Sequence, residues 1–156
     1  MKTVTFALVG VIALLAGCSS GVPDNDEPVA KTALAGSIAG KSFKAISGTA
    51  DVGSDGEASI AIYEEEVDCG SFGGKDTERM ILTAASWKDG YETGFSLSTQ
   101  TATLSPAKGE NLVAVTGRIE VIKAGEGEKG TIRLRAYYDD DNQVEGEIDL
   151  KVCEGF

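Results

Sequence analysis

A strict alternation of residue types near the C-terminus constrains the fold more than any other feature of this 156-residue chain. Over residues 144–152 the even positions are apolar or glycine and the odd positions are charged. Neighbouring side chains of a β-strand point to opposite faces, so this period of two predicts a strand with one buried face. Residues 132–138 alternate in a similar way, and the loop 139–142, Asp-Asp-Asp-Asn, joins the two segments. Together they predict a β-hairpin.

Further strand signals occur through the rest of the chain after residue 34. Val113, Val115, Ile119 and Val121 share one parity, and Gly117 interrupts it, which predicts a bulge or a close approach of backbone. Residues 79–85 are nearly continuous in apolar character, which favours a central strand over a short helix. The weaker candidate strands are residues 36–46, 58–64, 79–87, 91–98 and 102–104.

Turn signals separate these segments at short intervals. Clusters of glycine with aspartate, serine, lysine or glutamate are typical of tight turns. About seven to nine short strands at this spacing predict an all-β fold, a single antiparallel β-sandwich or barrel-like domain over residues 34–156. The turn clusters are residues 53–56, 73–76, 88–90 and 125–128.

The charge balance and the absence of histidine exclude several classes of function. The chain has 14 Lys plus Arg against 25 Asp plus Glu, a net charge of −11, and no His. Sequence-independent nucleic-acid binding needs cations to neutralise phosphates, so no nucleic-acid partner is expected. Catalysis by Ser-His-Asp or Cys-His groups and histidine-ligated zinc are excluded as well. We therefore expect neither an enzyme nor a bound cofactor.

The first residues have the pattern of a secretory signal peptide. Lys2 precedes an apolar run over residues 4–15, and small residues follow it. The whole run to Gly17 covers 14 residues, fewer than the roughly 20 that a membrane-spanning helix needs. A cleaved signal is therefore favoured over a transmembrane helix.

The end of this run, Leu15-Ala16-Gly17-Cys18, resembles the lipobox of bacterial lipoproteins. The resemblance implies a signal peptide at residues 1–17 and lipid attachment at Cys18, with a diacylglycerol on sulfur and a further acyl chain such as palmitate on the freed amine. Two or three acyl chains hold a protein on a membrane stably, whereas one chain does so only marginally. The membrane is thus the expected partner, in the cell envelope.

Residues 18–33 are expected to form the lipidated Cys and a flexible acidic tether. They contain two prolines, small residues and the acidic cluster 24–27, with little apolar area to order them. Asp after the lipidated Cys retains the enteric lipoproteins that this chain resembles in the inner membrane. Ser19 stands there instead, which favours the outer membrane.

Cys69 and Cys153 are the two other cysteines of the chain. An exported protein meets an oxidising compartment, so the two cysteines are predicted to pair in a disulfide bond. The alternative is a pair of buried free thiols.

Clusters of carboxylates are the remaining candidates for chemistry. Residues 139–142 offer three adjacent carboxylates, but they lack the ligand spacing of calcium-binding loops, so a hairpin tip is favoured over a metal site. Residues 51–57 have the composition of a turn. Residues 64–68 carry four acids beside a predicted strand end, where a solvated surface is favoured over paired-carboxylate catalysis. No metal site is therefore expected.

Residues 36–43 and 144–148 resemble the opening and closing strands of uncharacterised β-rich bacterial lipoproteins. This resemblance implies a lipid-anchored envelope protein whose β domain has a binding or structural role without catalysis, and whose ligand could be protein or carbohydrate. One alternative is an inhibitor of a cationic hydrolase such as lysozyme, since some known lysozyme inhibitors are small acidic β lipoproteins with one disulfide. The other is a carboxylate- or metal-dependent enzyme.

Overall fold

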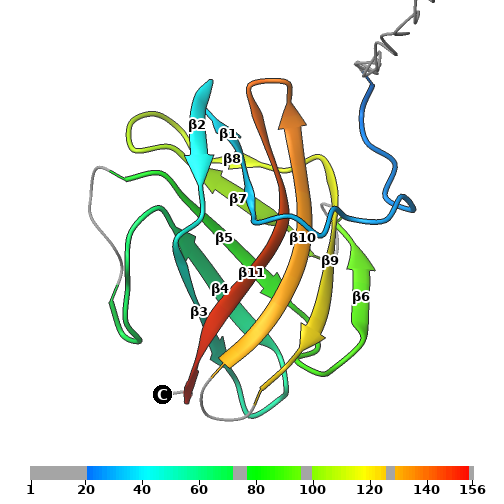
Figure 1. The fold of residues 1–156 in the computed structure, drawn as a ribbon, viewed down its shortest axis with the longest axis vertical. Helices are drawn as coiled ribbons and strands as arrows, with labels where there is room; N and C mark the ends of the chain where they lie inside the picture. The colour runs from blue at the N-terminus through cyan, green and yellow to red at the C-terminus, as the bar shows by residue number, and fades with distance from the viewer. Residues whose placement is uncertain (1–20, 72–76, 96–99, 126–128, 155–156) are drawn as a thin grey trace, which may run out of the picture.

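The structure, a computed structural model, describes residues 21–71, 77–95, 100–125 and 129–154. The described residues form one all-β sheet of eleven strands and contain no helix (Figure 1). The expected signal peptide, residues 1–17, and the expected lipid-attachment residue Cys18 lie outside the described residues. The strands are β1 (Ala35–Ile38), β2 (Lys41–Lys44), β3 (Ser47–Val52), β4 (Ala58–Tyr63), β5 (Arg79–Ala84), β6 (Tyr91–Gly94), β7 (Ala102–Ser105), β8 (Leu112–Val113), β9 (Thr116–Lys123), β10 (Lys129–Asp139) and β11 (Asn142–Glu154).

The sheet is built around the long hairpin of β10 and β11. Its main path runs β6-β9-β10-β11-β3-β4-β5-β7-β8, and β1 pairs with β11 and with β2. On the edge away from β10, the first part of β11 pairs with β1 and its last part pairs with β3. The β11–β3 pairing is parallel, so the sheet is mixed, although its other strand pairs are antiparallel. The expected all-β, barrel-like class is confirmed.

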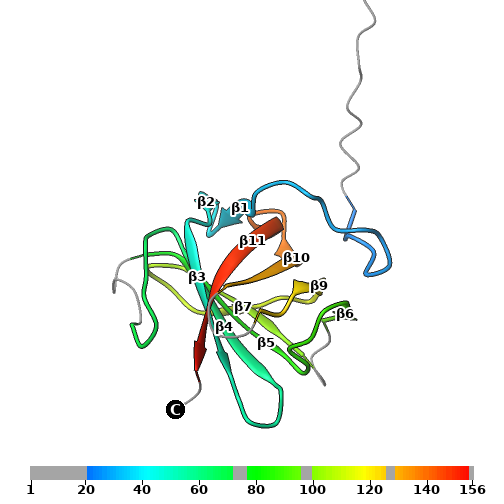
Figure 2. The same cartoon turned by 60° about the horizontal axis from the view of Figure 1, so that its bottom comes forward.

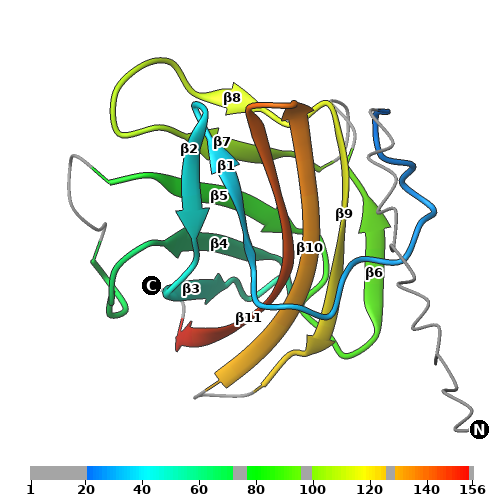
Figure 3. The same ribbon diagram turned by 45° about the horizontal axis from the view of Figure 1, so that its top comes forward.

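The sheet curls strongly into a half-barrel, as the turned views show (Figures 2 and 3). The short segment between β8 and β9 links the two ends of the curl. The amide of Ala114 donates to the carbonyl of Ala102 on the β7 side at 2.8 Å. The next amide, that of Val115, donates to the carbonyl of Tyr137 on the β10 side at 2.8 Å. We call residues 114–115 the β8–β9 corner.

The inward faces of the strands form one hydrophobic core. Ile132, Leu134 and Ala136 of β10 are completely buried, and they lie opposite Ile148, Gly146 and Val144 of β11. These are the residues whose alternation predicted the hairpin, so that prediction is confirmed in both strands. The largest fully buried side chains of the core are Leu34, Ile38, Phe43, Ile60, Ile62, Met80, Leu82, Leu104, Ile119, Ile132, Leu134 and Leu150.

Two strand predictions differ from the structure in an instructive way. Residues 36–46 form two strands rather than one, because the chain reverses at Ala39 and Gly40, which have φ of 53° and 70°. The sequence pattern does not predict β3 at all. Its outward residues Ser47 and Thr49 are small and polar, yet they are buried, and the Ser47 hydroxyl donates to the Glu65 carbonyl at 2.6 Å. Short polar residues do not reveal a strand whose outer face is covered by another segment.

Other strand predictions hold with adjusted ends. Residues 79–87 contain β5, a strand and not a helix, and residues 58–64 and 102–104 contain β4 and β7. Gly117 marks a close approach of backbone, as expected, since a Cβ there would lie 2.1 Å from the carbonyl oxygen of Arg135. Parts of the expected strand 91–98 and of the turns 73–76 and 125–128 lie outside the described residues.

Cys69 and Cys153 form a disulfide bond, with an S–S distance of 2.01 Å and a Cα–Cα distance of 5.7 Å. The predicted pairing is thus present in the structure. The bond connects the segment after β4 to the end of β11, where Cys153 lies opposite Asp51 of β3. Nearby, the Lys151 ammonium donates to the Val67 carbonyl at 3.2 Å and also pairs with Asp68. The segment before Cys69 is therefore fixed to β11 twice. Among the described residues, no helix is long and apolar enough to cross a membrane.

Candidate functional site

Charged side chains gather on the outer face of β6, β9, β10 and β11. They point outward because their neighbours in each strand fill the core. Arg133 of β10 donates to Glu120 of β9 at 3.0 Å and to Glu147 of β11 at 2.7 Å. These ion pairs link three neighbouring strands, and their hydrogen bonds raise the pKa of Arg133, with Glu147 contributing most.

Arg118 extends the charged face to the edge strand β6. Its guanidinium pairs with Glu92 of β6 at 2.6 Å and with Glu120 of its own strand at 3.2 Å. The hydrogen bond to Glu92 is the main cause of the raised pKa of Arg118. Glu120 therefore receives two cations, and each of these ion pairs joins an arginine to a glutamate of its own or a neighbouring strand.

Residues 23–34 cross this charged face, and we call them the strap. The Leu34 side chain is in the core and the Val29 side chain is buried, at 1% and 3% exposed. The strap pairs with β11 through Leu34 and Thr32, whose amide and carbonyl bond to Glu147 at 3.0 and 2.7 Å. Residues 23–33 belong to the segment 18–33 that the sequence predicts as a flexible tether, and in the structure they make polar contacts with the sheet.

Asn25 fastens the first part of the strap to β9. Its side-chain oxygen accepts hydrogen bonds from the Thr116 hydroxyl at 2.5 Å and from the Gly117 amide at 2.8 Å. Its backbone carbonyl accepts from Arg118 at 3.3 Å. Gly117 has φ of 151°, and Gly94 of β6 lies beside the Asn25 amide group. Gly94 thus lies against the Asn25 side chain, whereas Gly117 allows β9 to approach the Arg135 carbonyl closely.

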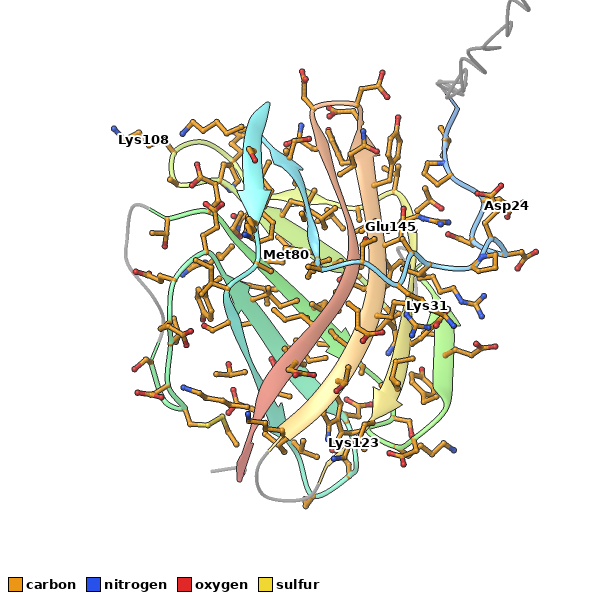
Figure 4. The ribbon with its side chains drawn as sticks, viewed as in Figure 1. Asp24, Lys31, Met80, Lys108, Lys123 and Glu145 are labelled. Atoms are coloured by element: carbon orange, nitrogen blue, oxygen red, sulfur yellow. A yellow bond between two sulfur atoms is a disulfide. The ribbon has the colours of Figure 1, made fainter. Side chains whose placement is uncertain are left out.

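Arg135 holds the rest of the strap. Its guanidinium donates to the carbonyls of Asp24 and Pro28 at 3.1 and 3.0 Å, and to Glu145 at 2.9 Å. Glu145 in turn accepts from the Ala30 amide at 2.7 Å (Figure 4). Burial alone would raise the pKa of Glu145, but the hydrogen bonds from Arg135 and Ala30 outweigh it and hold the pKa below its ordinary value. Arg135 is only 7% exposed, and its charge is balanced by Glu145.

A shallow groove of about 270 Å³ lies between the strap and β1, over β10 and β11. Tyr137 lines it and donates its hydroxyl hydrogen bond to Asp140 at 3.1 Å; burial and this bond both raise the Tyr137 pKa. The one cation and the one carboxylate that line the groove neutralise each other. A groove of this kind suits a small uncharged polar group better than an ion. The lining residues are Pro23, Ala35, Gly36, Ser37, Arg135, Ala136, Tyr137, Gln143, Val144 and Glu145.

The carboxylate clusters of the sequence serve as turn and surface residues. In the hairpin tip, Asp139 accepts from the Asp141 amide at 3.1 Å and from the Asn142 side chain at 2.7 Å. Within the cluster 51–57, Asp55 accepts from the Glu57 amide at 3.1 Å. In the cluster 64–68, Glu64 accepts from the Lys44 amide at 3.0 Å. Throughout the described ranges, no group of three or more Asp, Glu or Cys side chains is arranged to hold a metal ion.

Sequence reasoning missed the residues that build this site. Arg135 is recognisable only as an outward residue of a strand, and Asn25 only as part of a polar segment with two prolines. One signal of the site is present in the sequence: Gly117 interrupts a strand pattern, and its amide is where the Asn25 side chain binds. What occupies that place could not be read from the pattern, because the two residues are 92 positions apart.

Comparisons with known proteins gave no match of any kind. No protein-family model, no curated protein and no solved structure matches this chain. Its function is therefore inferred from its own residues and contacts.

Proposed function

We propose that the chain is a lipid-anchored bacterial envelope protein whose β domain has a non-catalytic binding or structural role. The observation that carries the proposal is the Cys69–Cys153 disulfide bond. Structural disulfides form and persist in oxidising compartments outside the cytosol. An exported chain fits the signal-like residues 1–17, and the lipobox then assigns acylation to Cys18.

The contacts between the strap and the sheet also support this proposal. It leads from the residues after Cys18 directly into the fold, and Arg118 and Arg135 donate to three of its carbonyls within 3.3 Å. An anchor attached at Cys18 would therefore be joined to the sheet by an ordered segment. The proposed role of the charged face is to hold this segment, and the groove beside the strap is the proposed place for a ligand. Ser19 favours the outer membrane as the destination.

Metabolic labelling with radioactive palmitate in a bacterial host tests the anchor. The wild-type chain is expected to incorporate label and to sediment with membranes, and Cys18→Ser is expected to lose both properties. The matched control is the double variant Cys69→Ser/Cys153→Ser, which changes two cysteines but keeps Cys18, and which should remain labelled. An unlabelled wild-type chain, or a labelled Cys18→Ser variant, would refute the proposal.

A further inference from the structure

One end of the half-barrel brings the beginning of the strap together with three chain reversals. The β1–β2 turn contacts the β10–β11 turn, since the Gly40 amide donates to the Asp141 carbonyl at 3.0 Å. The β8–β9 corner contacts the end of β10 through Val115 and Tyr137. Pro23 joins them, because its carbonyl accepts from Thr116 at 3.5 Å. Figures 1 and 3 show the first described residues of the strap level with this end, which we call the anchor end.

The chain between Cys18 and this end is short. Five residue steps separate Cys18 from Pro23, and a fully extended chain covers at most about 18 Å over that distance. The β10 strand, which runs from the opposite end toward the anchor end, has 11 residues and a length of roughly 35 Å. A lipid on Cys18 can therefore reach the membrane easily when the anchor end faces it. With the opposite end facing the membrane, the lipid would have to span most of the domain.

Three exposed apolar or aromatic side chains lie at the same end. Val22, Val115 and Tyr138 are 66%, 52% and 39% exposed. The hydrogen bond from Val115 to the carbonyl of Tyr137 places Val115 beside Tyr138 in the neighbouring strand. Tyrosine is suited to the region where lipid headgroups meet acyl chains, and the two valines add apolar surface beside it. At the opposite end, the β3–β4 and β5–β6 turns expose polar residues such as Asp55 and Asp89, and Ile122 near the end of β9 is 40% exposed.

We propose that the anchored protein turns its anchor end to the bilayer that holds its own acyl chains, with Val22, Val115 and Tyr138 against the headgroup region. This inference rests on the proposed lipidation of Cys18. The carboxylates of the hairpin tip, Asp139 to Asp141, lie at the same end and repel anionic lipids. The contact is therefore with zwitterionic lipid, and it weakens as the anionic fraction of the bilayer rises.

Depth-dependent fluorescence quenching of the full-length lipidated protein tests this orientation. Asp141→Cys and Asp55→Cys form a matched pair, because each replaces an exposed turn aspartate, one at each end of the barrel. The introduced thiol is the reactive one, since Cys69 and Cys153 are bonded and Cys18 carries the lipid. Each variant is labelled with an environment-sensitive dye and reconstituted into phosphatidylethanolamine–phosphatidylcholine vesicles that contain a headgroup-attached quencher.

We expect roughly threefold stronger quenching at position 141 than at position 55, because the two turns are separated by about the length of β10. Equal quenching, or stronger quenching at position 55, would overturn the proposal. Inserting 20 Gly/Ser residues after Ser20 adds a reach of roughly 25 Å and should bring the ratio close to one. An unchanged ratio would contradict the short chain as the cause of the orientation.

The lipidation itself is checked separately by flotation of the same vesicles. A labelled chain that does not float with the vesicles contradicts the proposed anchor. A chain that floats but shows no difference between positions 141 and 55 contradicts the orientation alone.

Discussion

The outer surface of the sheet has two halves that differ in chemistry. The charged half lies on β6, β9, β10 and β11, where seven charged residues form ion pairs under the strap: Glu92, Arg118, Glu120, Arg133, Arg135, Glu145 and Glu147. The neutral half lies on β3, β4, β5 and β7, and its central outward residues are Thr49, Ser59, Ala61, Ile81, Thr83 and Thr103. In the described part of the chain, the segment after β4 covers this half at β3, where Ser47 bonds to Glu65 and Val67 and where Thr49 is buried, whereas Ser59, Ile81 and Thr83 are exposed.

The difference shows what the charges do. A segment that lies across strands leaves many of its carbonyls without backbone partners, and buried carbonyls need donors. Arg118 and Arg135 supply those donors to the strap, while the carboxylates between the cations balance their charge. Among the described residues, no such segment lies over Ser59, Ile81 and Thr83 of β4 and β5, so β-branched and small residues suffice there. The charged half is thus a docking surface for the protein's own N-terminal segment.

The largest effect is expected at the boundary of the two halves, where Cys153 lies near the end of β11 and opposite Asp51 of β3. Replacing both Cys69 and Cys153 with alanine removes a bond that closes a loop of 84 residues. The free energy of unfolding should fall by about 4 kcal/mol by the chain-entropy estimate. Urea denaturation followed by circular dichroism measures it, and reduced wild-type protein is the control. Equal stability of the oxidised and reduced proteins would contradict the expectation.

Removing the main donor of the charged half should release the strap. In Arg135→Met, the carbonyls of Asp24 and Pro28 and the Glu145 carboxylate lose their partner, and we expect a loss of about 2–3 kcal/mol. Hydrogen exchange of residues 23–30 should accelerate strongly. Arg133→Met is the matched control, because Arg133 bonds to Glu120 and Glu147 and to no strap residue in the contacts described. If both variants exchange alike, Arg135 has no special role in holding the strap.

A smaller change, Asn25→Ala, tests the hydrogen bonds by which Asn25 holds the beginning of the strap on β9. The Thr116 hydroxyl and the Gly117 amide lose an acceptor, so the expected cost is about 1–2 kcal/mol, confined to the start of the strap. Limited proteolysis near residue 25 should become faster. Asp26→Ala changes an exposed neighbour and should leave the cleavage rate unaltered; a similar acceleration there would argue against this role of Asn25.

Low pH should weaken the docking of the strap onto the sheet, because it protonates the Glu145 carboxylate. The pKa of Glu145 is lower in the folded protein than its ordinary value of 4.5, so the carboxylate stabilises the docked strap above that pH. As the pH falls below 4.5 and through the folded-state pKa, the stabilisation is lost. Hydrogen exchange of the Ala30 amide, corrected for intrinsic rates, should show a transition in this range. Glu145→Gln, which does not titrate, should show none at this amide.

The smallest effect is expected on the neutral half. Ile81 is 38% exposed, and it takes no part in the contacts described between the strap and the sheet. Replacing it with threonine, another β-branched residue, should change the free energy of unfolding by less than about 0.5 kcal/mol. Thermal denaturation measures the change. A large loss of stability would mean that this half is covered in solution, contrary to the comparison drawn above.

The sequence predicts the parts of this fold that depend on local patterns. Alternation identifies β10 and β11, and the pairing of Cys69 with Cys153 follows from their number and the expected compartment. Contacts between distant segments are not predictable in this way. The parallel pairing of β11 with β3 and the binding of Asn25 at Gly117 each join residues more than 90 positions apart. Val113 and Val115 share the parity of Ile119, yet they are exposed, because the chain changes direction at the β8–β9 corner.

The position of β11 also determines when the domain can fold. β11 is the last strand of the sheet in chain order, yet it contacts β10, β1 and β3, and Gly146 lies close to Leu34 where its partner changes. β1 and β3 are therefore synthesised well before their partner β11, and pairing between strands so distant in sequence is slow. An emerging chain without β11 has unpaired edges on β1, β3 and β10. We therefore expect the sheet to fold cooperatively and only once β11 is present, because β11 pairs with all three of these strands.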